Sequence, residues 1–350
     1  MIELKIDFKR WMPFLIVLVV LLGLVFIVAD LDQIWTALQE ANWKIIPLAL
    51  ATTLIAYTCI SINFAQVSRL LGVDMSLKDL TIIGYVSSII NRIVLSGGAA
   101  GYSVRFMLMR GYGVTMREVV AISILHFYLT SLLMISMLPA GFIYLGLNAE
   151  LGQTTTILLA IAALLLILVA ILATALIFSN KLRKRVLGTL VKAIDTLIHR
   201  DVSDPLERFD ETMDKGVKAM GKNRSTMVII ASLILIDWIF SATTLWFCFL
   251  AFDITLSIGE LVSGFVIGTV AGVASLFPGG LGIQEASMTG IFTLFGIPFE
   301  IAVLASILYR VIFMIIPYLI SLGFYRFVLR SQDEEESPIT QEAEYENPYA

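Results

Sequence analysis

Residues 154–178 read TTTILLAIAALLLILVAILATALIF, a run of 25 residues without a charged side chain. A membrane-spanning helix needs about 20 apolar residues, so this run is long enough to cross a bilayer. The whole chain agrees, because 58% of its 350 residues are hydrophobic, 15% are charged, and the mean hydropathy is +0.90. Soluble domains are about 45–50% apolar and about 25% charged. The sequence therefore predicts an all-α, polytopic integral membrane protein and excludes a soluble globular one.

Ten apolar segments are expected to enter the membrane. Eight are long enough to span it, at 12–29, 45–63, 80–96, 118–146, 154–178, 227–251, 260–277 and 299–326, and two shorter ones, 99–110 and 284–296, follow glycine clusters. Lys and Arg concentrate in cytoplasmic loops. The basic clusters of this chain all fall on the cytoplasmic side of the membrane only if both short segments penetrate the membrane. We therefore expect about eight long transmembrane helices plus two short broken or re-entrant helices. In this multi-pass cell-membrane protein, both termini are expected in the cytoplasm.

These segments divide the chain into two membrane halves. Residues 1–180 form the first, with a broken helix near 97–110, and residues 226–330 form the second, with a broken helix near 278–296. Residues 181–225 are a basic cytoplasmic linker whose apolar residues recur at helical spacing, which favours an amphipathic helix on the membrane surface. Residues 331–350 form an acidic tail that we expect to be disordered. Seven acids in this tail account for the net charge of −4, since 24 basic and 21 acidic residues remain elsewhere.

The two glycine breaks resemble each other. Gly97-Gly98-Ala99-Ala100-Gly101 lies 182 residues before Gly279-Gly280-Leu281-Gly282. Ser76–Asp79 precedes the first break and Ser257–Glu260 the second, and both have the spacing of a helix-starting capping box. Because the crossing count gives the copies opposite orientations, we interpret the chain as an inverted repeat of five plus five segments, typical of secondary transporters. The alternative is chance similarity between apolar helices.

Glycine has a physical use at such breaks. Non-helical backbone at membrane depth is tolerated where protein or a wet cavity satisfies it. A helix that restarts after the break points unpaired N–H groups at the gap, which suits a phosphate or carboxylate. The alternative is that the glycines only permit close helix packing. The candidate substrate-binding positions of these loops are Gly97, Gly98, Gly101, Pro278, Gly279, Gly280 and Gly282.

Six ionisable residues lie inside the apolar segments, where each costs about 2.5–3.5 kcal/mol at a helix centre. They are Arg92, Arg105, His126, Asp237, Glu285 and Arg310. Guanidinium groups bind phosphate bidentately, so the three arginines are candidates for an anionic headgroup, with Glu285 fixing an arginine or carrying a proton. The alternative is a structural Glu285–Arg310 ion pair without a ligand. Asp237 and His126 are further proton or ion candidates, although a lone intramembrane His is commonly a packing residue.

Signals for enzymatic chemistry are absent from the sequence. The two histidines (His126, His199) and two cysteines (Cys59, Cys248) form neither a metal-ligand pattern nor a nucleophile–base set, and there is no P-loop. We therefore expect a transporter-like protein with no catalytic residue, no metal and no cofactor. Nucleic acid is not an expected partner, and the oligomeric state is left open.

Residues 277–286 read FPGGLGIQEA, and Phe295-Gly296-Ile297-Pro298 and Tyr309-Arg310 follow. This pattern resembles the lysylphosphatidylglycerol synthase transmembrane-region family, also called flippase-like domain proteins, over almost the whole chain. The resemblance implies hallmark positions at Pro278, Gly279, Gly280, Gly282, Glu285 and Arg310. It also implies a role like that of the domain which, in multiple peptide resistance factors, moves aminoacylated phosphatidylglycerol between leaflets.

The sequence departs from that family in two places. Where members commonly have an acid–Arg pair in the first repeat, this chain has His126-Phe127, so a symmetric charge role is in doubt. After Arg330 the sequence contains an acidic tail rather than an aminoacyltransferase domain, so the resemblance implies a stand-alone member without synthase activity.

These observations lead to a lipid translocase as the main hypothesis. An anionic phospholipid or polyprenyl-phosphate headgroup would cross through a cavity between the two glycine-broken helices, with membrane lipids as the partners. Two alternatives stay open at this stage. One is a proton- or ion-coupled carrier of a small anion, and the other is a membrane scaffold subunit of a lipid or glycan transferase.

Overall fold

The computed structural model describes residues 31–93, 99–149, 151–198, 203–275 and 278–320. Every regular element in these ranges is a helix, which confirms the all-α prediction. The α-helices are α2 (Leu31–Glu40), α3 (Ile46–Leu70), α4 (Leu77–Ile93), α5 (Ala99–Met109), α6 (Met116–Asn148), α7 (Gln153–Phe178), α8 (Asn180–Ile198), α9 (Ser203–Lys222), α10 (Arg224–Leu250), α11 (Ile258–Ala274), α12 (Ile283–Leu294) and α13 (Phe299–Arg310). Short turns η1 (Trp43–Ile45), η2 (Arg110–Tyr112), η3 (Pro278–Gly280) and η4 (Val311–Ile315) join or extend them.

Five of the described helices are long and apolar enough to cross a membrane. They cover Trp43–Leu70, Met116–Asn148, Gln153–Phe178, Arg224–Leu250 and Phe299–Ile320, as the sequence predicts for five of its long segments. Segments 80–96 and 260–277 contain α4 and α11, of which 17 residues each are described, at the lower limit of the length that spans a bilayer. Segment 12–29 and the tail 331–350 lie outside the described residues. The count of about eight spans therefore stays a prediction.

The second glycine break forms a helical hairpin. Along α11, Gly264, Gly268 and Gly272 face Phe292, Met288 and Gln284 of α12 in that order, so residue numbers rise on one helix as they fall on the other. A Cβ on Gly268 would lie 2.3 Å from Met288 Cγ, so only glycine lets the two helices approach this closely. The short helix α12 therefore folds back along α11 instead of continuing it. The first break likewise joins two helices that pack together, α4 and α5.

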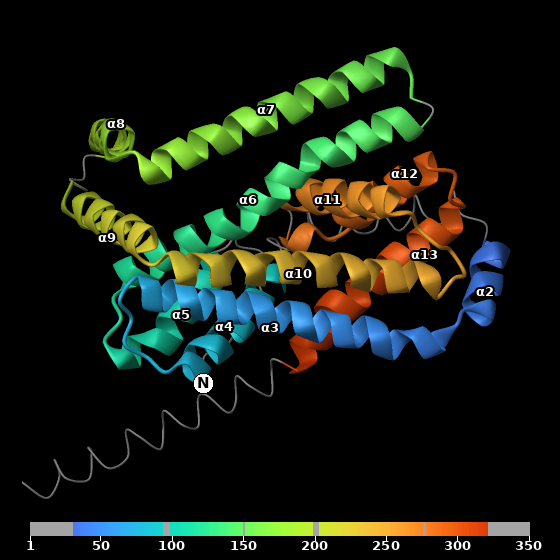
Figure 1. Cartoon of the computed structure of the whole chain (residues 1–350), viewed down its shortest axis with the longest axis horizontal. Helices are drawn as coiled ribbons and strands as arrows, with labels where there is room; N and C mark the ends of the chain where they lie inside the picture. The colour runs from blue at the N-terminus through green and yellow to red at the C-terminus, as the bar shows by residue number, and fades with distance from the viewer. Residues whose placement is uncertain (1–30, 94–98, 150, 199–202, 276–277, 321–350) are drawn as a thin grey trace, which may run out of the picture.

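The helices that precede the two hairpins, α3 and α10, lie side by side and run in opposite directions (Figure 1). Asn42 N–H donates to the Ala251 carbonyl at 2.7 Å, where α3 begins and α10 ends. Farther along, the Thr52 and Thr244 hydroxyls share a hydrogen bond of 2.8 Å. Antiparallel α3 and α10 are what an inverted repeat requires.

Serine caps the helix at both predicted capping boxes, and at the second the reciprocal bond from the Ser257 N–H to Glu260 completes the box. Asp79 N–H donates to Ser76 Oγ at 3.1 Å at the start of α4, and Glu260 N–H donates to Ser257 Oγ at 3.3 Å at the start of α11. The same order of elements thus occurs twice, in α3–α6 and in α10–α13: a long helix, a serine-capped helical hairpin and a second long helix. The five-plus-five count includes segment 12–29 and stays a prediction.

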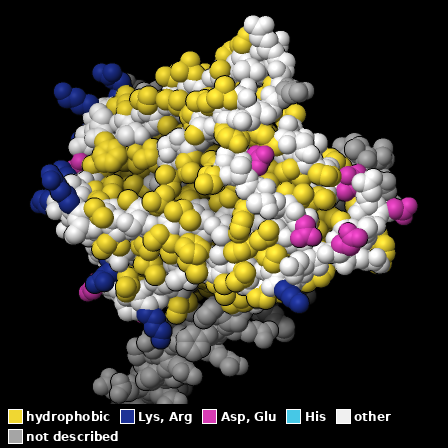
Figure 2. Space-filling model, turned by 45° about the vertical axis from the view of Figure 1, so that its right-hand side comes forward, with side chains coloured by type: hydrophobic (Ala, Val, Ile, Leu, Met, Phe, Trp, Pro, Cys, Tyr) yellow, Lys and Arg dark blue, Asp and Glu magenta, His cyan; other side chains and the backbone are white. Residues whose placement is uncertain are grey.

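The charged side chains separate toward two ends of the molecule. Figure 2 shows most Lys and Arg at one end, most of the visible Asp and Glu at the other, and a hydrophobic belt between them. This distribution is expected of a protein whose middle lies in hydrocarbon. The linker forms two helices, α8 and α9, and α9 packs against α3, α6, α7 and α10. Helix α9 is therefore packed into the bundle, while the surface position of the amphipathic helix, whose apolar residues lie in α8, stays a prediction.

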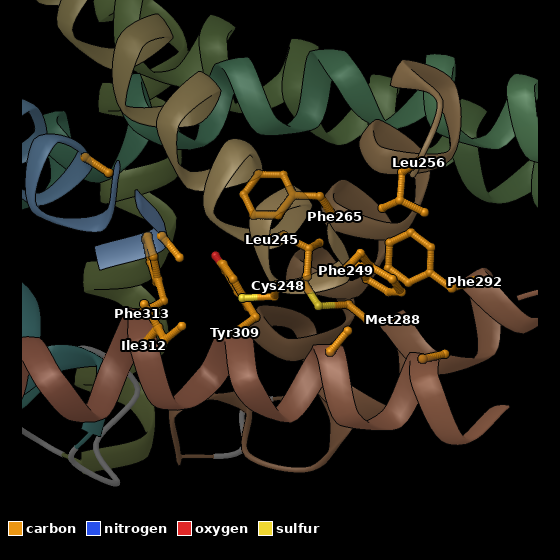
Figure 3. Close-up of a cluster of buried hydrophobic side chains, with 14 of the residues drawn as sticks. Leu245, Cys248, Phe249, Leu256, Phe265, Met288, Phe292, Tyr309, Ile312 and Phe313 are labelled. Atoms are coloured by element: carbon orange, nitrogen blue, oxygen red, sulfur yellow. The ribbon is translucent and has the colours of Figure 1, made fainter. Parts of the chain in front are cut away.

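A buried aromatic cluster joins the four helices of the second copy (Figure 3). The rings of Phe249 and Phe292 lie 4.4 Å apart between centroids, and Phe265 meets Tyr309 edge-on at 6.2 Å. Tyr309 also stacks on Phe313 at 5.1 Å. Because Tyr309 is the residue before Arg310, this packing fixes the helix position from which Arg310 extends.

Candidate functional site

Arg310 holds the glycine loop of the second hairpin. Its Nε donates to Glu285, Nη1 donates to the Gly279 carbonyl at 2.8 Å, and Nη2 donates to Gln284 Oε1 at 3.0 Å. Weaker contacts reach the Gly280 carbonyl at 3.4 Å and Met314 Sδ at 3.5 Å. Arginine has five N–H donors, and all five are directed at protein atoms. Arg310 therefore acts as a clamp on the loop in this conformation.

The loop needs glycine at several positions. Gly279, Gly280 and Gly282 have φ values of 58°, 64° and 79°, in the left-handed region that residues with a Cβ rarely adopt. A Cβ on Gly280 would also lie 2.8 Å from Gly272 Cα, a backbone atom that cannot easily move. Pro278 begins the η3 turn just before them. The spacing of the glycines thus serves a tight reversal at the end of α11.

Glu285 links the clamp to the start of α12. One carboxylate oxygen accepts from Arg310, and the other accepts from the Gly282 N–H at 2.6 Å. The Glu285 carboxylate therefore caps the positive end of the helix while it neutralises the arginine. This geometry matches the structural ion pair that the sequence analysis left open. Direct headgroup binding by Arg310 and proton transfer by Glu285 stay predictions.

A π-helical turn follows Arg310 directly, at Val311–Ile315. Within this turn, the Phe313 carbonyl accepts a 2.9 Å hydrogen bond from the Tyr57 hydroxyl of α3. The first copy thereby supports the helix that carries the clamp of the second.

Arg105 has a different environment. It lies on α5 with 5% of its surface exposed, its Nε donates to Ser87 Oγ at 3.0 Å, and its Nη1 donates to Ser123 Oγ at 2.8 Å. Its guanidinium carbon lies 4.4 Å from the centroid of the Phe64 ring. Within the described ranges, no acid pairs with Arg105 and no acceptor receives a hydrogen bond from Nη2. Because a buried cation without an anion is costly, Arg105 suits an anion better than the fully bonded Arg310 does, and its role in binding a headgroup stays a prediction.

Two further buried polar residues lie on the helices around Arg105. His126 of α6 packs edge-on against Phe64 with 5.7 Å between ring centroids, so both His126 and Arg105 contact the same ring. His126 Nε2 has no hydrogen-bond partner in the part of the chain that the structure describes, and neither amide atom of the fully buried Asn63 has one. These atoms could accept or donate to a polar ligand or to water. A proton role for His126 stays a prediction.

We define the Arg105 cluster as Arg105, Ser87, Ser123, Phe64 and His126. The sequence analysis singled out Arg105 and His126 and missed the other three. Ser123 and His126 are three residues apart and share one face of α6, a signal that was available. Ser87 and Phe64 come from α4 and α3, and no local pattern connects them to Arg105.

The remaining candidates are placed only in part. The side chain of Arg92 is not described, and Gly97 and Gly98 lie outside the described residues. Gly101 lies buried in α5. Asp237 is buried on α10, and Ser241 Oγ lies at a hydrogen-bonding limit of 3.5 Å from it. A proton or ion role for Asp237 therefore stays a prediction.

The two hairpins meet although their arginines do not touch in the described structure. Helix α4, which leads into the first break, packs against η3 and η4 of the second copy. Helix α4 therefore lies close to the Pro278–Gly280 turn, which Arg310 holds. The candidate site therefore has two parts, the Arg105 cluster around the first hairpin and the Arg310 clamp at the second.

Comparisons with known proteins agree with this architecture. The family described as Lysylphosphatidylglycerol synthase TM region matches residues 14–321. A UPF0104 membrane protein of Methanothermobacter thermautotrophicus is 30% identical over 153 residues, which are 41% of this chain and 46% of the relative. A phosphatidylglycerol lysyltransferase of Staphylococcus aureus strain MRSA252 is 25% identical over 257 residues, 73% of this chain and 26% of the relative. The chain therefore spans less than half of the length of these curated relatives.

Proposed function

The chain belongs to the lysylphosphatidylglycerol synthase TM region family, and from this membership we propose that it is a lipid translocase. Its cargo is an anionic phospholipid or a polyprenyl-phosphate lipid, whose headgroup crosses between leaflets along the two hairpins. The name of the Staphylococcus aureus relatives points to phosphatidylglycerol as the substrate of those proteins. The match covers 26% of that relative, so its transferase activity is not carried over to this chain.

One observation supports the proposal most strongly, namely the buried Arg105 without an acidic partner in the described structure. Ser87 and Ser123 orient the guanidinium but supply no negative charge, so a phosphate would complete the site. Arginine matches phosphate with two parallel N–H donors, which gives the headgroup a defined orientation. The acyl chains remain in the bilayer, so few charges inside the protein are sufficient.

Arg310 and Glu285 have a positioning role in this proposal. They hold the Pro278–Gly282 turn against α4 and so fix one wall of the headgroup path. Arg310 could contact the headgroup only after it releases a loop carbonyl. An inverted pair of hairpins is the arrangement in which alternating access around a central site occurs in transporters.

We also propose the orientation and the absence of catalysis. The end that carries α8, α9 and most Lys and Arg faces the cytoplasm, because basic residues concentrate there. The chain moves lipid without making or breaking a covalent bond.

The test is reconstitution of the purified protein in liposomes that contain one fluorescent lipid at a time. Phosphatidylglycerol, phosphatidic acid and a polyprenyl phosphate are compared with zwitterionic phosphatidylcholine, and a membrane-impermeant quencher reports headgroup exposure. Fluorescence from the inner leaflet is protected from the quencher until the lipid crosses the bilayer. For at least one anionic lipid we expect this protected fluorescence to be lost faster than in empty liposomes, and for phosphatidylcholine we expect little change. Empty-liposome rates for every anionic lipid would overturn the proposal. Uptake of a soluble anion instead would favour the carrier alternative.

A further inference from the structure

A groove runs between α6 and α7, on the side of the molecule where α7 lies apart from the bundle (Figure 1). It has a volume of about 740 Å³, which is within the range of about 300–1,000 Å³ for ligand pockets. Its main apolar walls are Leu132, Ile135, Pro139, Ile167, Ile171 and Phe178. At membrane depth, a groove of this largely apolar composition suits an acyl chain, and the Ser136 hydroxyl that also lines it donates to the Leu133 carbonyl of its own helix.

Hydroxyl groups mark the end of the groove next to α8. Thr174 and Ser179 line it there, and the Tyr128 hydroxyl donates to Thr174 Oγ1 at 2.9 Å. Ser179 is the residue between α7 and α8. The groove thus changes from apolar to polar where the chain leaves the membrane, as a lipid changes from acyl chain to headgroup.

The buried Arg183 fixes the connection between α7 and α8 at Ser179. Arg183 donates to Asp210 of α9, to Asn180 Oδ1 and, at 2.6 Å, to the Ile177 carbonyl of α7. It therefore connects α7, α8 and α9 at one point. Arg183 thus fixes the start of α8 relative to the groove.

Three other basic residues of the same turn remain exposed, namely Lys181, Lys184 and Arg185. Among the described residues, no carboxylate lies within ion-pair range of these three. In Figure 1 α8 is seen end-on while α7 runs across the view, so α8 lies across the end of α7. Basic residues at a membrane surface attract anionic lipid headgroups.

We propose that the groove and these three residues form a binding site for an anionic glycerophospholipid of the leaflet next to α8. One acyl chain lies in the α6–α7 groove, and the phosphate contacts Lys181, Lys184 and Arg185. This site is separate from the Arg105 cluster and does not rest on lipid translocation. The chemistry of this site selects the charge of the lipid headgroup and not a particular acyl chain.

The experiment uses nanodiscs that contain equal amounts of phosphatidylglycerol and phosphatidylcholine, with a photoreactive diazirine on the acyl chain of one lipid at a time. Mass spectrometry then locates the labelled residues. We expect phosphatidylglycerol to label the groove walls many-fold more than phosphatidylcholine. Replacement of Lys181, Lys184 and Arg185 by Ala should reduce this preference by about five-fold for each residue removed. Equal labelling by both lipids, or a preference that survives the triple replacement, would overturn the proposal.

A second variant tests the groove itself. Ala170 lines it, so Ala170→Phe fills the space and should decrease labelling of the walls by either lipid. Leu168→Phe is the matched control, because Leu168 is 52% exposed on α7 and does not line the groove. The triple replacement changes only exposed side chains, so it leaves the fold intact even if Ala170→Phe does not. Cross-links between two copies of α7 in place of lipid labels would also contradict the site.

Discussion

Arg310 on α13 donates to Glu285 on α12, and the same guanidinium donates to the carbonyls of Gly279 and Gly280 in the loop that joins α11 to α12. The two side chains are only 13% and 15% exposed. The pair therefore closes a hairpin and is not a pair of free charges at a cavity wall. Arg105 lacks any such partner in the described structure, so the two arginines should respond to substitution in opposite ways.

Removal of one member of the Glu285–Arg310 pair should destabilise the protein. Glu285→Gln leaves a nearly buried guanidinium without its anion, and Arg310→Gln leaves the carboxylate without its cation and removes the arginine donors of the Gly279 and Gly280 carbonyls. We expect about 3 kcal/mol for each single change, measured by thermal unfolding in detergent. The double variant should lose clearly less than the sum of the two. Strict additivity would show that the residues do not interact in solution.

Methionine in place of Arg105 should give the opposite result. The substitution removes a buried cation that no described acid neutralises, so the melting temperature should stay constant or rise. Headgroup translocation should fall to the rate of empty liposomes. Arg310→Met is the matched control and should lower the melting temperature. An equal loss of stability for both variants would contradict the assignment of Arg105 as an anion site.

The hairpin glycines should differ sharply in their tolerance of alanine. Gly280→Ala places a Cβ 2.8 Å from Gly272 Cα at a φ of 64°, so we expect destabilisation of about 2 kcal/mol or more. Gly290→Ala on α12 meets no atom within 4 Å and should be neutral or slightly stabilising. The comparison requires only melting temperatures of the two variants. A neutral Gly280→Ala would refute the tight turn.

The contact between α8 and α9 should depend on pH, because Asn180 of α8 donates to the Asp214 carboxylate of α9. Hydrogen bonds from Lys218 and Asn180 hold the pKa of Asp214 below its ordinary value of 3.8. A lowered pKa means that Asp214 stabilises the folded state above pH 3.8 and that this contribution is lost as the pH falls through the folded-state value. Asp214→Asn should therefore weaken the contact between α8 and α9 at pH 7 and have little effect on it at strongly acidic pH. Amide hydrogen exchange of α9 measures this, and a pH-independent difference would contradict it.

The sequence predicts features that depend on local chemistry. The serine caps at Ser76 and Ser257, the long apolar helices and the glycine break near Pro278 follow from capping, hydropathy and glycine spacing. The hairpin register was not predicted, because it depends on Gly264, Gly268 and Gly272 facing particular residues of α12. Their four-residue spacing was readable but does not identify a partner helix.

The contacts around Arg105 could not be predicted for a similar reason. Ser87 and Ser123 are both 18 residues away and come from different helices. An isolated serine in an apolar helix usually bonds to its own backbone, as Ser61 does to Tyr57. Ser87 also donates to the Gly84 carbonyl of its own helix, and only the three-dimensional packing decides that it accepts from an arginine as well.

The central claim is that Arg105 binds a lipid phosphate during translocation. The most direct measurement compares the initial rates of headgroup translocation by wild type and Arg105→Gln, with Gly290→Ala as a folding-matched control, in liposomes that contain the lipid transported best. The account predicts fast translocation by wild type and Gly290→Ala, and the empty-liposome rate for Arg105→Gln. Translocation by Arg105→Gln at the wild-type rate would contradict it.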